Sequence, residues 1–208
     1  MNNSQRGAKR AIDIAVSGIV LLGSAPVLLP AMLAVRFVLG SPVLFRQARP
    51  GLNGELFELV KLRTMTDGRD ANGELLPDEQ RIHWFGDLLR KSSVDELPSL
   101  LNILRGEMSL VGPRPLLPRY LERYSPEQAR RHDVKPGLTG LAQVSGRNLL
   151  GWNTRMKLDV EYVDTQSLKL DMVILAKTVR SVLNRTGIYA ADGRVPREFG
   201  MDDASAGG

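Results

Sequence analysis

The chain has 208 residues and a formal net charge of +5, with 28 lysines and arginines against 23 acidic residues. This length fits one sizeable domain or two very small ones, and the absence of cysteine excludes disulfides, thiolate metal sites and a cysteine nucleophile. The excess of positive charge favours an anionic partner, such as nucleic acid, acidic lipid or a phosphorylated substrate.

The first long segment is apolar and uncharged from Ile14 to Val35, and about 20 residues of this kind are enough for a helix to cross a bilayer. Pro26 and Pro30 lie inside it, and each proline removes a helical hydrogen bond. Because both flanks are basic, both ends prefer the cytoplasmic side. We therefore predict a re-entrant helix that breaks at Pro26 and returns to the same face, with a straight span and a cleaved signal peptide as alternatives. The flanking cations are Arg6, Lys9, Arg10, Arg36, Arg46 and Arg49.

The rest of the chain is predicted to form a compact α+β domain with a small β-hairpin. Asn53-Gly54 favours a tight turn between two short apolar strands. Ser93 and Glu96 have the spacing of a capping box, which predicts that a helix opens at Ser93. By residue ranges, the expected strands are 43–45, 56–60 and 108–111, the helices are 79–91, 93–104, 118–124, 125–131, 153–165 and 168–183, and the loops include 67–79 and 135–140.

The helix expected at 168–183 has an apolar stripe with basic residues beside it. Such a stripe is either a face that packs into the core or a face that lies on a membrane surface, and amphipathicity alone does not separate the two. The stripe comprises Leu168, Met172, Leu175, Val179 and Val182, and the basic residues are Lys169, Lys177 and Arg180.

These elements divide the chain into three parts. Residues 1–40 hold the basic start and the re-entrant membrane helix, and residues 41–189 form the cytoplasmic domain. Residues 190–208 are expected to form a disordered tail.

The candidate chemistry rests on an acidic pair among basic residues, because the sequence holds no P-loop, no dinucleotide-binding glycine motif and no nucleophile elbow. Taken alone, Asp95 and Glu96 would simply stabilise the start of the predicted helix. Arginines in loops made rigid by proline or glycine favour a phosphate pocket instead, since arginine binds phosphate bidentately. Carboxylates beside bound phosphate need a divalent cation, which predicts Mg²⁺, and Asp95 can then attack phosphorus. The basic residues are Lys61, Arg90, Arg114 and Arg147.

Five segments stand in order along the chain: 61–65 (KLRTM), 93–98 (SVDELP), 106–115 (GEMSLVGPRP), 135–140 (KPGLTG) and 143–148 (QVSGRN). With the proline-containing N-terminal segment, they closely resemble bacterial sugar transferases, the monotopic polyprenol-phosphate phosphoglycosyl transferases, over residues 6–186. The resemblance implies transfer of a phosphosugar from a UDP-sugar to undecaprenyl phosphate, with release of UMP. In such proteins this reaction is the first membrane step of glycoconjugate or exopolysaccharide synthesis.

The resemblance also implies a role for each site residue. Asp95 resembles the nucleophile that carries the phosphosugar as a covalent intermediate, and Glu96 resembles its partner on the Mg²⁺ side, so both carboxylates are candidate metal ligands. Family members use this pair with Mg²⁺ in a two-step reaction. The residues implied to bind substrate are Arg90 and Arg114 at the phosphates, Lys61 in the same pocket and Arg147 at the nucleotide end.

One departure from the family pattern lies in the membrane segment. Ala25 precedes Pro26 where the family often has serine, so Ser24 or Ser17 is expected to supply the missing hydroxyl. The chain otherwise resembles the minimal members of the family, many of which use N-acetylated amino-sugar donors.

The implied location is the bacterial inner membrane, with the catalytic domain on the cytoplasmic face. The implied partners are a UDP-sugar, a polyprenyl phosphate and membrane lipid, without nucleic acid, and a homodimer is compatible with the sequence. The rival hypothesis is a membrane-anchored polyanion-binding protein without catalysis. It accounts for the anchor and the charge, but an acidic pair among the arginines would oppose polyanion binding.

Overall fold

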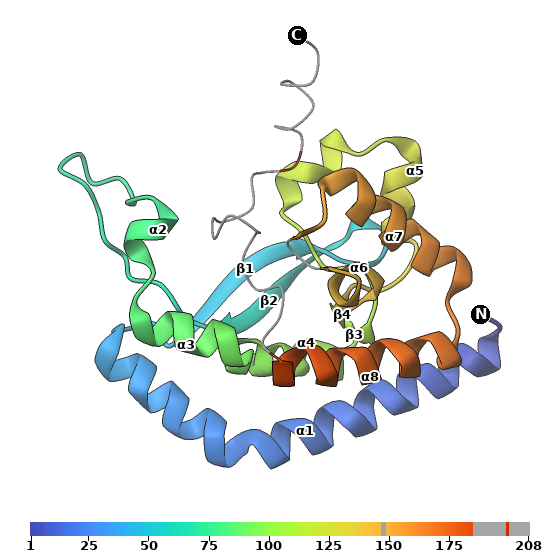
Figure 1. Ribbon diagram of the computed structural model, residues 1–208, viewed down its shortest axis with the longest axis horizontal. Coiled ribbons are helices and arrows are strands. Elements are labelled where there is room, and N and C mark those ends of the chain that lie inside the picture. Colours follow the sequence, from blue (N-terminus) through green and yellow to red (C-terminus); the bar gives the residue numbers. More distant parts are fainter. Residues whose placement is uncertain (147–148, 185–198, 200–208) are drawn as a thin grey trace, which may run out of the picture.

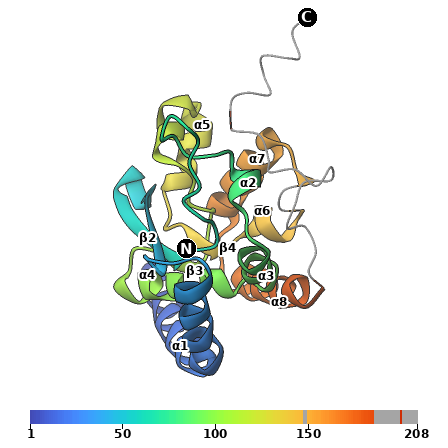
Figure 2. The same ribbon diagram turned by 90° about the vertical axis from the view of Figure 1, so that its left-hand side faces the viewer.

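The computed structural model describes residues 1–146, 149–184 and 199 (Figure 1). Arg147 and the tail predicted to be disordered at 190–208, Phe199 apart, therefore lie outside the described residues. The described part combines many helices with two small sheets, as the α+β prediction requires. Helix α1 (Asn3–Val38) lies along one side of the molecule. The adjoining layer is formed by α3 (Trp84–Ser92), α4 (Leu100–Arg105) and α8 (Leu168–Asn184). The hairpin, α5 (Pro126–Ala129) and α7 (Trp152–Thr165) lie beyond that layer (Figure 1, Figure 2).

Helix α1 (Asn3–Val38) contains both prolines and remains helical through them. The predicted break at Pro26 is therefore wrong: α1 is one continuous helix, which is bent so that both of its ends turn toward the rest of the chain (Figure 1). Pro26 has no N–H to donate to the carbonyl of Leu22, which is a standard cause of bending. The Ser24 hydroxyl donates to the neighbouring carbonyl of Leu21 at 3.1 Å, whereas the buried Ser17 hydroxyl has no partner among the described residues.

Helix α1 is the one helix in the described part of the chain that is long and apolar enough to cross a membrane. Only 11% of its most apolar 18-residue stretch is buried. A core helix of a water-soluble domain buries most of such a stretch, so α1 presents an apolar surface outward. Its exposed side chains include Ile14, Ile19, Leu22, Val27, Leu29, Leu33 and Phe37.

The predicted hairpin is confirmed. Strands β1 (Leu44–Pro50) and β2 (Leu56–Leu62) pair in antiparallel fashion and are joined by a short 3₁₀ turn, η1 (Leu52–Gly54). Asn53 and Gly54 have φ angles of 54° and 78°, the left-handed conformation that makes Asn-Gly a turn signal. Both strands are longer than the apolar pattern indicated. The turn brings residues on its two sides into register, so the polar residues near the turn also pair between the strands.

Between β2 and α3 the chain forms a projecting arm of residues 66–81, visible beyond the end of α1 in Figure 1. Its two sides pair with each other, as in the backbone hydrogen bonds from Thr66 to Arg81 and from Asp70 to Glu74. Helix α2 (Asp78–Arg81) lies near its base. The single helix predicted at 79–91 is therefore two helices, α2 and α3 (Trp84–Ser92), because the His83 side chain caps a new start by accepting from the Phe85 N–H.

The predicted capping role of Ser93 is wrong. Ser93 adopts a left-handed conformation (φ 57°) and ends α3, with its N–H bonded to the carbonyls of Leu89 and Arg90. Its side chain makes no capping bond to the next helix, a 3₁₀ helix η2 (Val94–Ser99) that continues into α4 (Leu100–Arg105). The sharp left-handed turn lets α3 and α4 both bury apolar side chains, which a capped helix start at Ser93 would prevent.

A second sheet lies at the loop predicted for 135–140. Strand β3 (Ser109–Val111) was expected, but its parallel partner β4 (Gly137–Thr139) was not. Strand β4 lies so close to the end of β3 that a Cβ on Gly137 would lie 2.1 Å from the Gly112 nitrogen. Glycines that read as loop signals in the sequence thus permit close packing of the two strands.

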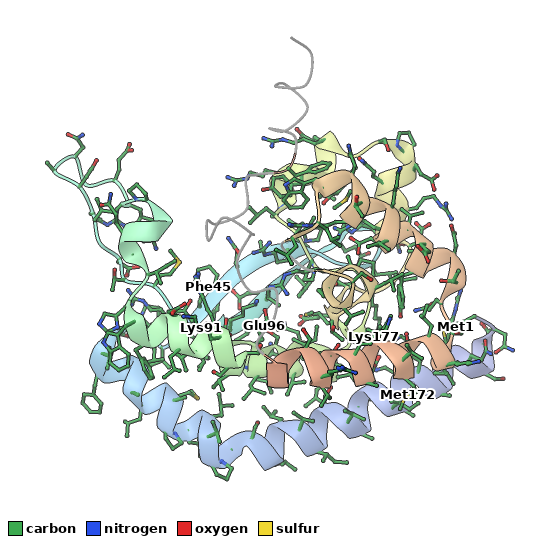
Figure 3. All side chains as sticks on the ribbon, viewed as in Figure 1. Met1, Phe45, Lys91, Glu96, Met172 and Lys177 are labelled. Atoms are coloured by element: carbon green, nitrogen blue, oxygen red, sulfur yellow. The ribbon has the colours of Figure 1, made fainter. Side chains whose placement is uncertain are left out.

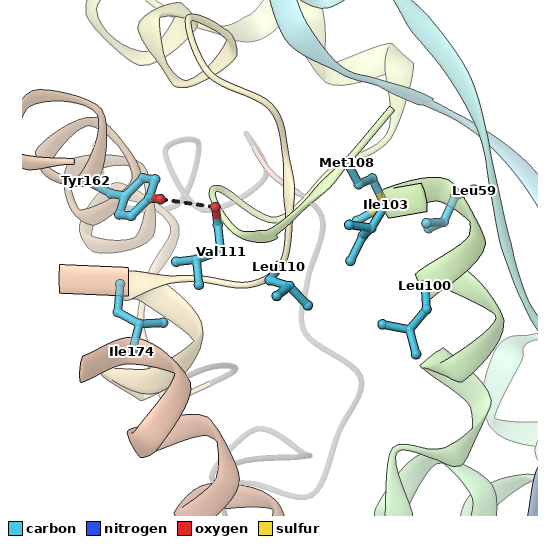
Figure 4. Packing of buried hydrophobic residues seen from close by; sticks show 8 residues of the cluster. All are labelled: Leu59, Leu100, Ile103, Met108, Leu110, Val111, Tyr162 and Ile174. Carbon is cyan, nitrogen blue, oxygen red and sulfur yellow. Dashed lines mark hydrogen bonds between the residues drawn. The ribbon is translucent and has the colours of Figure 1, made fainter. Parts of the chain in front are cut away.

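The C-terminal half is mainly helical. Tyr162, Ile174 and Val111 belong to the larger hydrophobic core, and the Tyr162 hydroxyl donates to the Val111 carbonyl at 3.0 Å (Figure 4). The remaining elements are η3 (Pro118–Arg123), α5 (Pro126–Ala129), η4 (Arg130–His132), α6 (Leu141–Val144), α7 (Trp152–Thr165) and α8 (Leu168–Asn184).

The apolar stripe predicted on α8 is divided between the core and the surface, because Leu175 packs against the larger hydrophobic core. Met172 and Val179 are 57% and 61% exposed, whereas Asp171 and Ile174 are buried and Thr178 is bonded to Thr139. The inward side of α8 is therefore partly polar. Helix α8 lies in the layer that adjoins α1 (Figure 1, Figure 2), and Met172 and Val179 are the exposed members of the stripe.

Candidate functional site

Strand β2 brings Lys61 to the acidic pair. The hairpin register places Lys61 opposite Phe45, on the face of the hairpin that also carries Leu59. The Lys61 ammonium group donates to Glu96 Oε1 at 2.6 Å, and both side chains are mostly buried. Figure 3 shows Glu96 near the centre of the molecule, where the hairpin meets the layer of α3 and α4.

Asp95 and Glu96 lie in the first turn of η2, directly after the left-handed turn at Ser93. Asp95 is 8% exposed, yet none of the described residues donates a hydrogen bond to its carboxylate. Glu96, by contrast, accepts two charged donors on one oxygen. Among the described residues, the adjacent carboxylates therefore differ: Glu96 is bonded to two cations, and Asp95 accepts no hydrogen bond.

The loop after β3 holds Arg114 between Pro113 and Pro115, whose rings restrict the backbone. Arg114 Nη2 donates to Glu96 Oε1 at 2.9 Å, so Arg114 and Lys61 share one carboxylate oxygen. About half of the Arg114 side chain is exposed. Its other guanidinium nitrogens are thus accessible to a ligand while one nitrogen is held in place.

Arg90 reaches the site from the last turn of α3. Its Nε donates to Thr64 Oγ1 at 2.9 Å, and its positive charge lowers the pKa of Asp95. The structure therefore brings Lys61 and Arg114 into contact with Glu96, and Arg90 into electrostatic range of Asp95. Of the other predicted residues, Arg147 lies outside the described residues and Pro26 belongs to α1.

The two carboxylates have opposite pKa shifts. Burial raises the pKa of Asp95 to about 6, the negative charge of Glu96 adds to this rise, and Lys61, Arg90 and Arg114 act against both. Burial would also raise the pKa of Glu96, but the charges of Lys61 and Arg114 outweigh it and hold that pKa far below its usual range. At neutral pH Glu96 is a fixed anion, and Asp95 is a mostly ionised carboxylate that readily exchanges its proton.

Sequence reasoning missed a buried ion pair that supports Arg114. Arg131 Nη2 lies 2.7 Å from Asp159 Oδ2 and also donates to the Arg114 carbonyl at 2.7 Å. Arg131 and Asp159 are 2% and 3% exposed. They lie on η4 and α7, and because they are far from the motifs in sequence, no pattern connected them to the site.

The donor set fits Mg²⁺ only together with a ligand. No group of three or more metal-binding side chains occurs among the described residues, and Asp95 with Glu96 offers two carboxylates. Mg²⁺ is commonly held by one or two carboxylates plus substrate phosphates. Asp95 and the second oxygen of Glu96 are therefore the residues that would hold the ion, and it would offset the negative charge of a bound diphosphate.

Comparison with known proteins gives a consistent result. The family described as bacterial sugar transferase matches residues 4–185. An uncharacterized sugar transferase, EpsL of Bacillus subtilis, is 50% identical over 95% of this chain and 98% of its own length. The UDP-glucose:undecaprenyl-phosphate glucose-1-phosphate transferase of Caulobacter vibrioides is 42% identical over 87% of this chain and 72% of its own length.

A third relative is longer. The undecaprenyl-phosphate galactose phosphotransferase of Salmonella typhimurium is 38% identical over 89% of this chain, which corresponds to 42% of its own length. The family match covers residues 4–185, so it includes the acidic pair of this chain and the surrounding cations. The match is to enzymes, which removes the hypothesis of a polyanion-binding protein without catalysis. The chain belongs to the bacterial sugar transferase family and is a phosphoglycosyl transferase.

Proposed function

We propose that this chain transfers a phosphosugar from a UDP-sugar to a polyprenyl phosphate, such as undecaprenyl phosphate, through a covalent intermediate on Asp95. The observation that carries the proposal is the contrast within the acidic pair. Asp95 is buried, accepts no hydrogen bond from the described residues and has a pKa of about 6, while Lys61 and Arg114 occupy Glu96. A carboxylate that lies beside three cations and has no hydrogen-bond partner among the described residues suits attack on an anionic phosphorus centre.

The first step forms an acyl phosphate. A carboxylate oxygen of Asp95 attacks the phosphorus that carries the sugar, and the bond from this phosphorus to the bridging oxygen of the diphosphate breaks. UMP leaves with that oxygen and the bonding electron pair. Arg90 and Arg114 neutralise the charge that builds up on the phosphoryl oxygens, and Mg²⁺ held by the pair would offset the charge of the departing UMP.

The second step restores the enzyme. A phosphate oxygen of the polyprenyl phosphate attacks the same phosphorus, the bond to Asp95 breaks, and the carboxylate is regenerated as the lipid-linked diphosphosugar leaves. Two displacements let the water-soluble donor leave before the lipid acceptor arrives. Family relatives named for undecaprenyl phosphate support this acceptor.

The donor sugar is a finer part of the proposal. The names of two relatives specify glucose and galactose, whereas the resemblance to minimal family members favours an N-acetylated amino sugar. We retain the amino sugar as the expected donor. The mass of the covalent adduct distinguishes an amino sugar from a simple hexose directly, because the acetamido group makes the adduct heavier.

The proposed location is the cytoplasmic face of the bacterial inner membrane. Helices α1 and α8 lie on the same side of the molecule (Figure 2), and both carry exposed apolar side chains, which on α8 include Met172 and Val179. The bend of α1 turns both of its ends toward the catalytic part, as a re-entrant helix requires. Basic residues at both flanks favour the cytoplasmic side for both ends.

The experiment is intact mass measurement of detergent-purified protein after incubation with Mg²⁺ and single UDP-sugars, without lipid acceptor. The wild type is expected to gain a phosphosugar, and Asp95→Asn is expected to gain nothing. Addition of undecaprenyl phosphate should remove the adduct and yield the lipid product. Turnover with acceptor in the absence of any adduct would contradict the covalent mechanism, and an adduct that persists in Asp95→Asn would contradict the choice of nucleophile.

A further inference from the structure

A cleft of about 70 Å³ adjoins the acidic pair on the side of the hairpin. Its charged lining comes from Arg49, Lys61, Glu96 and Arg114, and its apolar lining includes Leu59, Met108 and Leu138. Three of the four charged side chains are cationic. The cleft therefore has an excess of positive charge, although Glu96 lies within it.

Arg49 contributes to this cleft through the hairpin register. Arg49 lies opposite Phe57, and Lys61 lies opposite Phe45. Because side chains alternate between the two faces of a strand, Arg49 and Lys61 share one face of the hairpin while Arg46 projects from the other. The hairpin thus presents two cations to the cleft, four strand positions apart, of which the sequence motifs indicated only Lys61.

The partners of Arg49 are neutral. Its Nη1 donates to the Pro115 carbonyl at 3.3 Å and its Nη2 donates to Gln47 Oε1 at 2.6 Å. Its Nε is buried without a hydrogen-bond partner. Among the described residues Arg49 forms no ion pair, whereas Lys61 and Arg114 both bind Glu96.

The position of Arg49 is unfavourable in free energy when no anion is bound. A partly buried cation that lacks an anionic partner loses hydration without an equivalent return. Burial, and next the charge of Arg114, lower the pKa of Arg49 to about 10, so the group is still charged at neutral pH. An anion placed between Arg49 and Arg114 would relieve their mutual repulsion and give the Arg49 guanidinium a charged acceptor.

We infer that Arg49 is a further phosphate-binding residue, which receives a phosphate group of a substrate in the cleft between the hairpin and the Arg114 loop. This inference rests on the proposed function for the identity of the substrates. Two sources supply the same chemistry: the diphosphate of the UDP-sugar and the phosphate of the polyprenyl acceptor. Arg49 acts on the substrate directly, while its bond to the Pro115 carbonyl also steadies the loop that holds Arg114.

The test measures the two half-reactions separately in Arg49→Gln, Arg49→Lys and Arg46→Gln. The first arm follows UMP release without acceptor at increasing donor concentration, and the second follows transfer from preformed adduct at increasing undecaprenyl phosphate concentration. Arg46 is the matched control, because it lies on the same strand but is exposed and pairs with Glu58 on the opposite face. Circular dichroism melting of each variant monitors folding.

In Arg49→Gln, the concentration of one substrate that gives half-maximal rate is expected to rise about tenfold or more, since a charge-assisted hydrogen bond is lost. Arg49→Lys should retain part of the affinity, and Arg46→Gln should match the wild type. A change confined to the first arm identifies the donor diphosphate as the ligand, and a change confined to the second identifies the lipid phosphate. Unchanged concentrations in both arms, or an equal loss of maximal rate in Arg49→Gln and Arg49→Lys with unchanged concentrations, would overturn the inference.

A binding measurement separates this inference from the proposed function. It uses Arg49→Lys, so it can still be made if Arg49→Gln does not fold. Calorimetry with inorganic pyrophosphate as the probe needs no turnover, and it is compared between the wild type and Arg49→Lys, which keeps the charge of the folded chain. Pyrophosphate binding weakened in the variant, with no UMP released from any donor by the wild type, would reject the proposed function and retain the anion site. UMP release by the wild type, with identical pyrophosphate binding in both proteins and identical half-reactions, would reject the anion site alone.

Discussion

At the scale of single residues, two neighbouring carboxylates of the site differ in their partners and in their pKa values. Asp95 and Glu96 are adjacent in sequence, but only Glu96 points at Lys61 and Arg114. Its pKa falls, while burial and the charge of Glu96 raise that of Asp95. Burial, with the added negative charge of Glu96, thus brings the pKa of Asp95 close to neutral pH.

The raised pKa of Asp95 predicts the pH dependence of the first half-reaction. Only the ionised carboxylate can attack phosphorus, so activity is lost as the pH falls through the pKa. At donor concentrations far below saturation, the rate of adduct formation should be level above about pH 7 and fall about tenfold per unit below about pH 6. Rapid-quench mass measurement from pH 5 to 8 checks this. A flat profile would contradict a pKa of about 6 for Asp95.

The same shift predicts a cost in stability. An aspartate whose folded pKa is raised above its unfolded value of about 3.9 destabilises the folded state progressively as the pH rises from that value to the folded pKa of about 6, and by a constant amount at higher pH. Asp95→Asn removes that cost and should stabilise the protein by about 1–3 kcal/mol at pH 8, but not at pH 4, where the folded state carries a protonated Asp95 and the penalty is nearly absent. Chemical denaturation at the two pH values measures the difference, and equal effects at both would contradict the assignment.

At the scale of elements, sequence patterns predicted the hairpin and the main helices because local turn chemistry and periodicity suffice for them. The Ser93 cap failed because a left-handed turn, set by packing on both sides, overrode the local signal. Strand β4 was missed because its pairing with β3 depends on contacts across 28 positions of sequence, from Ser109 to Gly137. The motifs indicated Asp95 and its cations, but Arg49 required the register of the folded hairpin.

Helix α3 is held against the end of β2 by a close contact at Gly86. A Cβ at this position would lie 1.8 Å from the Thr64 carbonyl oxygen. Gly86→Ala should therefore lower stability by about 1–3 kcal/mol and displace Arg90, which is bonded to Thr64. Gly7→Ala is the control, since nothing lies within 4 Å of its Cβ position. Thermal melting and the first half-reaction give the readouts, and equal melting of both variants would contradict this contact.

The exposed side chains of Met172 and Val179 on α8 predict a membrane-binding surface. Met172→Glu combined with Val179→Glu should weaken association with anionic phospholipid vesicles and leave the melting temperature within a few degrees of the wild type, because both side chains are exposed. Asn153→Glu combined with Thr154→Glu adds the same charge on exposed positions of α7. Vesicle flotation compares the two double variants. Equal retention on vesicles would contradict a lipid contact for α8.

At the scale of the whole molecule, the apolar helix and the catalytic part are joined by polar bonds into one unit. Arg10 donates to the carbonyls of Ile103 and Leu104 at the end of α4, and Asp13 accepts from the Leu110 N–H. Lys9 bonds both Asp171 and the Val111 carbonyl. The contacts of α1 therefore reach the strand that leads into the Arg114 loop.

The buried pair of Lys9 and Asp171 predicts a strong dependence on α1. Lys9→Met leaves the Asp171 charge buried without its cation, so it should lower the free energy of unfolding by about 3–5 kcal/mol in detergent. Arg46→Met breaks only the exposed pair with Glu58 and should cost less than about 1 kcal/mol. Denaturant titration of both variants decides. Similar losses would mean that the pair does not connect α1 to the catalytic part.

The projecting arm lies between two parts of the chain that each supply some of the site residues. A cut between Asn72 and Gly73, at its tip, would leave α1 and the hairpin with Lys61 in one fragment, and Asp95 with Arg114 in the other. The fragments would share a core, because β2 packs on η2 and Leu59 lies in one cluster with Leu100 and Ile103. The two halves, expressed separately and then combined, should therefore associate into an active split enzyme, and catalysis would report their association.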